Sequence, residues 1–187
     1  MSRQLLTPLS FVRIRFFHRF HYVVLVPSLF ALILTSFYYA SDGAVDLLGT
    51  TGMVQRLNEL LPILVGFYIA ALAAVATMQQ ERLDQYPCGE PPTLTRKYRG
   101  VIKAEKLTRR RFLSYLFSYM AFLSVMLYVA GIVGPFAATV YRNFEGLWWA
   151  EAVKGVILVA YLFSYGNLLS GTMFGLHYFA DRIHRDE

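Results

Sequence analysis

A dense group of cationic side chains is the feature of this sequence best suited to chemistry with a ligand. Eight lysines and arginines fall within sixteen residues of the stretch TLTRKYRGVIKAEKLTRRRF, namely Arg96, Lys97, Arg99, Lys103, Lys106, Arg109, Arg110 and Arg111. Cations at this density are typical of surfaces that contact phosphates or carboxylates. The sequence therefore predicts that these eight residues bind an anionic ligand or an acidic partner.

Two simpler interpretations of the same cations stay open. The interval 80–112 carries nine cations and four acids, so its net charge is +5. Positive charge in a short loop is an ordinary signal that the loop faces the cytoplasm. Cations next to a membrane helix also attract anionic lipid headgroups. The interval could thus be a topology signal or a lipid contact as well as a binding site. Thr108 is the expected N-cap of the helix that follows it.

Residues that could catalyse a reaction or hold a metal are scattered. His18 and His21 are three residues apart, and His177 and Asp181 are four apart. Neither pair supplies the three or four converging ligands that a zinc site needs. The sequence also lacks the common metalloprotease, phosphate-loop, nucleophile-elbow and dinucleotide-binding motifs. We expect no enzyme, no catalytic residue, no metal site and no cofactor.

The elements that position the cations are apolar and long. Of the 187 residues, 56% are hydrophobic and 16% are charged, a composition typical of a membrane protein. A helix of about 20 apolar residues crosses a bilayer, and the sequence predicts four such spans, at about 22–40, 60–78, 113–140 and 153–179. We expect a single all-α membrane domain over 1–187, built as two antiparallel hairpins joined by the connector 80–112. A kink or membrane exit is expected near Pro135.

The distribution of lysine and arginine predicts the orientation. Four lie in residues 1–19, nine in 80–112 and two in 182–185, so fifteen of the eighteen fall on one side of the predicted spans. Arg56, Arg142 and Lys154 fall on the other side. Because the side rich in cations faces the cytoplasm, both termini and the connector are expected there.

Small and polar residues form stripes on two of the predicted spans. One stripe contains Gly66, Ala70 and Thr77, and the other contains Ser164, Asn167, Gly171 and Gly175. Small residues spaced by four allow helices in lipid to approach closely. Polar atoms at this depth can also line an aqueous path between the subunits of an oligomer. Both interpretations, helix packing and a pore, follow from the sequence.

The layout resembles a family of small four-helix membrane subunits from bacterial anti-phage systems such as Hailong and Kiwa. The resemblance rests on the two hairpins, the basic connector quoted above and the small-polar last helix LFSYGNLLSGTMFG. It implies a homo-oligomer, a tetramer in particular, in the bacterial inner membrane. It further implies a role in antiviral defence, either sensing infection or permeabilising the membrane.

Two functions from different classes follow. The first is a homo-oligomeric ion channel or membrane-disrupting effector, gated through the basic connector by an anionic ligand such as a nucleotide or oligonucleotide. The alternative is a non-conducting membrane sensor or scaffold that docks a soluble cytoplasmic partner through the same connector. The first function predicts polar residues that line a path through the membrane, and the second needs none.

Overall fold

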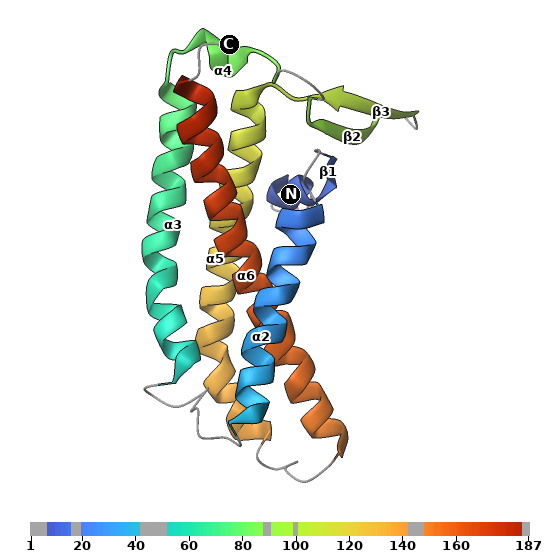
Figure 1. Ribbon diagram of the computed structural model, residues 1–187, viewed down its shortest axis with the longest axis vertical. Helices are drawn as coiled ribbons and strands as arrows, with labels where there is room; N and C mark the ends of the chain where they lie inside the picture. Colours follow the sequence, from blue (N-terminus) through green and yellow to red (C-terminus); the bar gives the residue numbers. More distant parts are fainter. Residues whose placement is uncertain are drawn as a thin grey trace.

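The computed structural model of the chain describes residues 7–15, 20–41, 52–87, 91–98, 101–141 and 148–184. Four long helices lie side by side in it (Figure 1): α2 (Val26–Ala40, extended at its start by the π-helical turn η2, His21–Leu25), α3 (Met53–Thr77), α5 (Arg109–Tyr141) and α6 (Trp148–His184). All four are long and apolar enough to cross a bilayer. The chain is therefore built like a multi-pass membrane protein, as the sequence predicts.

Helix boundaries differ from the predicted spans because the helices extend beyond their apolar parts. Helix α3 begins at Met53, before the span expected from residue 60. Helix α5 begins at Arg109 rather than at residue 113, and it continues past Pro135 to Tyr141 without ending there. Hydropathy marks only the part of a helix that suits lipid, whereas a polar first turn adds length at no cost in the bilayer.

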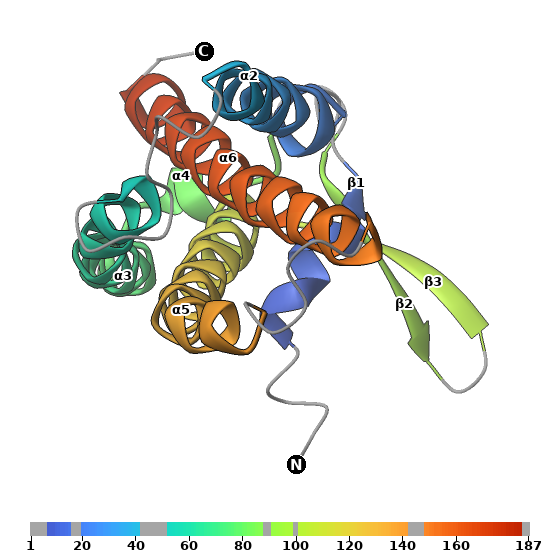
Figure 2. The same cartoon turned by 90° about the horizontal axis from the view of Figure 1, so that it is seen from below.

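The helices pair differently from the two predicted hairpins. Helix α2 packs along α6 rather than along α3, and α3 packs along α5. Helices α5 and α6 also touch, so α6 lies between α2 and the α3–α5 pair (Figure 2). The reason lies in α6, where Gly166 allows the backbone of Pro27 to approach closely.

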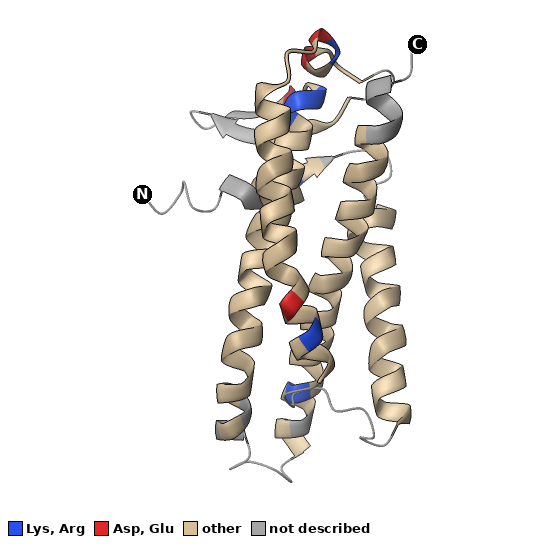
Figure 3. Ribbon diagram, turned by 90° about the vertical axis from the view of Figure 1, so that its left-hand side faces the viewer, with Lys and Arg blue, Asp and Glu red and all other residues tan. Residues whose placement is uncertain are grey.

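The outer surface of the bundle is apolar. Side chains that are more than half exposed include Leu32 and Ile33 of α2, Ile63 of α3, and Val156 and Ile157 of α6. Charged residues among those described gather toward the two ends of the bundle, and the helical middle is free of them (Figure 3). An apolar belt between two charged ends is the surface that a bilayer requires.

A small antiparallel sheet, absent from the predicted all-α fold, lies at one end of the bundle. Its strands, in the order β1-β2-β3, are β1 (Ile14–Arg15), β2 (Thr93–Tyr98) and β3 (Val101–Lys106), with η1 (Thr7–Arg13) before β1 and the short helix α4 (Glu81–Asp84) before β2. Leu94 pairs with Ile14 on one side and Glu105 on the other. Because Ile14, Leu94 and Leu107 are at most 1% exposed, the base of the sheet belongs to the core. We call this part of the molecule the hairpin end.

Candidate partner-binding surface

Helix α5 starts with three arginines in its first turn. Thr108 caps it, as predicted: the backbone N–H of Arg111 donates to Thr108 Oγ1 at 3.4 Å, and the N–H of Phe112 donates to the Thr108 carbonyl at 3.0 Å. The first turn of a helix carries the positive end of the helix dipole, where cations are unfavourable. The arginines of this turn therefore need nearby negative charge.

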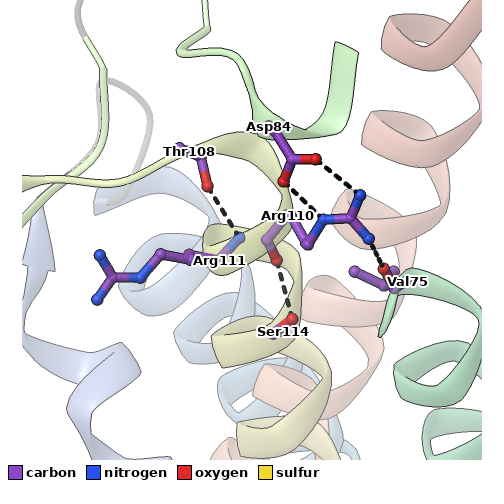
Figure 4. Close-up of polar contacts among 6 residues, drawn as sticks. All are labelled: Val75, Asp84, Thr108, Arg110, Arg111 and Ser114. Carbon is purple, nitrogen blue, oxygen red and sulfur yellow. Dashed lines mark hydrogen bonds and ion pairs between the residues drawn. The ribbon is translucent and has the colours of Figure 1, made fainter. Parts of the chain in front are cut away.

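Two carboxylates supply that charge, and Figure 4 shows one of them, Asp84. Arg110 forms a two-pronged ion pair with Asp84 of α4, with Nε to Oδ1 at 2.8 Å and Nη2 to Oδ2 at 3.0 Å. Arg111 pairs with Glu105 of β3 through Nη1 and Oε1 at 2.5 Å. Two parallel N–H···O bonds fix a guanidinium both in position and in direction. The ion pairs thus attach α4 and β3 to the start of α5.

Arg110 also reaches the end of α3. Its Nη1 donates to the carbonyl oxygen of Val75 at 2.7 Å, and Val75 lies in the last turn of α3. Carbonyls in the last turn of a helix have no partner within the helix, and a cation there is favoured by the dipole. One side chain therefore joins α3, α4 and α5 at the hairpin end.

Protonation of Asp84 should release α4 at low pH. The hydrogen bond and charge of Arg110 hold the pKa of Asp84 below its usual value of 3.8. A carboxylate with a lowered pKa stabilises the fold above its usual pKa, and this contribution is lost as the pH falls through the lowered value. We expect the amide protons of residues 81–86 to keep their exchange protection from pH 7 to about 5 and to lose it progressively as the pH falls below about 4 and through the lowered pKa of Asp84.

The measurement is hydrogen exchange at several pH values, corrected for the intrinsic exchange rate. Asp84→Asn should give the low-protection state at every pH. Glu81→Gln is the matched control, because Glu81 is an exposed acid of the same short helix and should leave the profile unchanged. Full protection of residues 81–86 in Asp84→Asn would contradict the role of the ion pair.

The other predicted binding residues belong to the hairpin or to its junction with α5. Lys106 is exposed at the end of β3, and Arg109 is half-buried at the start of α5. Lys103 is in β3, and Arg96 and Lys97 are in β2; their side chains, and the whole of Arg99, lie outside the described residues. The eight cations therefore divide into two that stabilise the fold, Arg110 and Arg111, and those carried by or next to the hairpin.

The hairpin projects sideways from the bundle. In Figures 1 and 2, β2 and β3 extend past the helices, while their base stays against the bundle. The N–H of Leu107 donates to the carbonyl of Pro92 at 2.8 Å and closes that base. A signal for the hairpin was present in the sequence: two short runs rich in β-branched and aromatic residues, 93–98 and 101–106, flank Gly100, and glycine is common between the strands of a hairpin. The density of cations in the same interval favours a single basic connector, so the hairpin was not predicted.

The polar stripe of α6 lies inside the bundle. Asn167 is 5% exposed, and its Nδ2 donates to the carbonyl of Val23 at 2.9 Å. Ser170, which the sequence analysis missed, donates to the carbonyl of Tyr22 at 2.8 Å. Ser164 donates to the carbonyl of Ala160 in its own helix. These polar atoms are satisfied within one chain, as the packing interpretation of the stripe expects.

Pro27 explains why two carbonyls of η2 need partners from another helix. A proline has no N–H. The carbonyl of Val23 lies four residues before Pro27 and that of Tyr22 five residues before it, the offsets of α-helical and π-helical bonding. In lipid each unsatisfied carbonyl is costly. Pro27 lacks the N–H that would bond one of these two carbonyls, and Asn167 and Ser170 supply one donor to each of them.

The glycines of the predicted stripes divide into two classes. A Cβ on Gly171 would collide with Met120 of α5, and one on Gly175 would meet Leu116 at 3.2 Å and Phe117 at 3.3 Å. Gly66 has nothing within 4 Å of such a Cβ, and Ala70 and Thr77 are exposed on the same helix. Asn167, Gly171 and Gly175 of the α6 stripe are therefore buried in the bundle, Ser164 is half-buried, and the α3 stripe faces outward.

Groups of three or more metal-binding side chains do not occur among the residues that the structure describes. His18 and the side chain of Asp181, each part of a possible pair in the sequence, lie outside that set. Comparison with protein-family models, with curated proteins and with solved structures finds no match for this chain.

Proposed function

We propose that this chain is a non-conducting membrane sensor or scaffold that docks an acidic surface of a soluble cytoplasmic partner on its β2–β3 hairpin. The observation that carries the proposal is the projecting hairpin, whose strands carry Arg96, Lys97, Lys103 and Lys106. The hairpin is anchored at its base and extends away from the helices (Figure 2). Such a surface meets a partner without any rearrangement of the bundle.

Charge on the hairpin favours an acidic partner. The two strands contain one acid, Glu105, and its charge is already matched by Arg111 of α5. The two strand sequences therefore carry four cations against one acid. Cations near one surface speed the approach of an acidic partner and exclude basic ones.

A partner that binds the hairpin would also act on the membrane helix α5. Strand β3 leads through Leu107, which is fully buried, to the Thr108 cap of α5. Arg111 joins β3 to the same turn, and Arg110 joins that turn to α4 and α3. A force on the hairpin thus acts on the start of α5 through a short, bonded path. This coupling supports a sensor over a passive anchor.

The resemblance to defence subunits supplies the class of partner. We place this chain in a bacterial inner membrane with the hairpin end in the cytoplasm. The partner we propose is an acidic soluble protein that acts during phage infection. Its acidic face, rather than a shaped pocket, would make the contact.

Reversing charges on the hairpin tests the proposal. Arg96→Glu, Lys103→Glu and Lys106→Glu together should weaken binding of a fluorescent acidic peptide by about tenfold or more, because repulsion replaces attraction at three positions. The measurement is fluorescence anisotropy, with the full chain in nanodiscs of zwitterionic lipid so that anionic lipid cannot compete. Arg110 and Arg111 are left intact because they stabilise the fold.

The matched control keeps the charge and changes the shape: Arg96→Lys, Lys103→Arg and Lys106→Arg. This variant should bind the peptide within about twofold of the wild type. Affinity should also fall as salt rises, because exposed charges are screened beyond about 8 Å at physiological ionic strength. Equal binding by the reversed variant and the wild type would remove the hairpin as the docking surface.

A homo-oligomeric channel gated by an anionic ligand is the second candidate. The outward α3 stripe favours it, because Gly66 has open space around it and Ala70, Ala73 and Thr77 are exposed beside it. Small residues on a lipid-facing surface allow a second copy to approach. A pore in this arrangement would form between subunits, next to α3 rather than α6.

A further inference from the structure

A cavity lies between the first turns of α3 and the last turns of α5, at the end of the bundle opposite the hairpin. It has a volume of about 440 Å³, and eight residues line it: Gln55, Asn58, Glu59, Pro62, Tyr128, Gly131, Ile132 and Pro135. The volume falls within the range of ordinary ligand sites. None of the eight residues carries a positive charge, and one of them, Glu59, is acidic.

Both prolines in the wall leave a backbone carbonyl without its helical donor. Pro62 is inside α3 and Pro135 is inside α5. Because proline lacks an N–H, the carbonyl four residues earlier receives no helical hydrogen bond. Those carbonyls belong to Asn58 and Gly131, which also line the cavity. Each of the two helices thus lacks the helical donor for one carbonyl of a residue that lines the cavity.

A third oxygen is buried beside them. Asn58 is 7% exposed, and its Oδ1 is buried without a hydrogen-bond partner. This oxygen lies directly over Gly131, where any Cβ would collide with it. Burying an acceptor without a donor costs free energy unless something else satisfies it. A bound cation would satisfy this oxygen and the two carbonyls together.

The charges of the lining residues favour a singly charged cation as the ligand. Glu59 is the sole carboxylate among the lining residues, whereas calcium sites take six to eight oxygens and usually several carboxylates. Backbone carbonyls without a helical donor are among the groups that coordinate Na⁺ in membrane transporters. The exposed ring of Tyr128 adds a π face, which also attracts cations.

We propose that this cavity binds a singly charged cation, held by Glu59, Asn58 Oδ1 and the carbonyls of Asn58 and Gly131. The cation is either an alkali ion, Na⁺ or K⁺, that keeps part of its water, or the ammonium head of a small amine. The volume has room for such an ion with several waters, at about 30 Å³ each. The site is independent of partner docking at the hairpin.

Radioactive sodium binding tests the proposal on the full chain in detergent micelles. We expect saturable binding of ²²Na⁺, displaced by unlabelled NaCl and by KCl. Ethylammonium chloride distinguishes the two sources of charge: if it displaces ²²Na⁺ better than KCl does, the site prefers an ammonium group. Replacing N-methylglucamine chloride by NaCl at constant ionic strength should raise Tm by about 3 °C at tenfold the dissociation constant.

Two variants make the assignment specific. Glu59→Gln keeps the shape and removes the charge, so it should weaken binding at least tenfold; Glu81→Gln, an acid at the hairpin end, should have no effect. Pro62→Ala restores a donor to the Asn58 carbonyl and should weaken binding by about threefold or more without changing any charge. The proposal is overturned if no cation binds saturably and Tm is the same in NaCl, KCl, ethylammonium chloride and N-methylglucamine chloride. It is also overturned if Glu59→Gln binds ²²Na⁺ as tightly as the wild type does.

Discussion

Removing the two polar side chains that bond η2 from α6 should destabilise the bundle by about 2 to 3 kcal/mol. The variant is Asn167→Ala with Ser170→Ala, and each change removes the side-chain donor to one carbonyl of η2. An unsatisfied buried acceptor costs about 1 to 3 kcal/mol in proteins in general, and hydrogen bonds between membrane helices are worth about 0.6 to 1.7 kcal/mol. The measurement is reversible unfolding of the purified protein in mixed micelles with rising dodecylsulfate.

Pro27→Ala tests whether the missing N–H of Pro27 is the reason that the Val23 carbonyl needs Asn167. Alanine restores the N–H that the Val23 carbonyl otherwise lacks. In this background Asn167→Ala should lower the free energy of unfolding by no more than about half of the amount that it does in the wild type. A double-mutant cycle measures this coupling. Ser164→Ala is the matched control, because Ser164 bonds a carbonyl of its own helix, and it should cost less than about 0.5 kcal/mol. An equal cost of Asn167→Ala in both backgrounds would contradict the explanation based on Pro27.

Replacing Gly171 by leucine should cost about 2 to 3 kcal/mol through overpacking. A Cβ at this position would collide with the end of the Met120 side chain, and Met120 is 1% exposed, so it has little space to move into. Extra atoms forced into a packed core typically cost about 1 to 3 kcal/mol. Unfolding in mixed micelles measures this change as well.

Two further variants separate crowding against Met120 from any general effect of replacing a helical glycine by leucine. Combining Gly171→Leu with Met120→Ala should cost less than the sum of the two single changes, because the leucine occupies the space that Met120 leaves. Gly66→Leu adds the same side chain where nothing lies within 4 Å, so the fold should keep its stability. If Gly66→Leu instead unfolds the protein as strongly as Gly171→Leu, crowding against Met120 is not the cause.

The four membrane helices could be predicted because their signal is local. Long apolar runs specify a bilayer-spanning helix almost regardless of what surrounds them. The Thr108 cap was equally local, since a threonine before the first helical residue suffices. The importance of Asn167 also followed from its type, because an amide at this depth needs a partner. Its partner did not follow: the Val23 carbonyl lies 144 residues away in the chain.

Pairing between distant segments is what the sequence could not supply. Asp84 and Arg110 are 26 residues apart, and nothing in their types says that they meet. The prediction therefore assigned Arg110 and Arg111 to a ligand, whereas both already hold carboxylates of the same chain. The order of the helices was missed for a similar reason, because the fit of α2 against Gly166 depends on three-dimensional shape rather than on adjacency in the chain.

This division of the cations changes how the protein should be probed. Reversing Arg109, Arg110 and Arg111 together would remove both ion pairs of the first turn of α5 and would confuse loss of fold with loss of binding. Reversals confined to the hairpin avoid that problem, because its exposed Lys106 is outside both ion pairs. Function and stability can therefore be tested with separate variants of one chain.

Flux through liposomes distinguishes a docking protein from a channel. Purified protein, shown to be inserted and folded, is reconstituted into liposomes loaded with K⁺ and a small dye, and the acidic peptide is added on the hairpin side. A docking protein whose α6 polar atoms are satisfied inside the bundle predicts leakage equal to that of protein-free liposomes, with and without peptide, while the peptide binds. Leakage of K⁺ or dye that begins when the peptide is added, and that Gly66→Leu abolishes, would contradict this account and establish the channel formed beside α3.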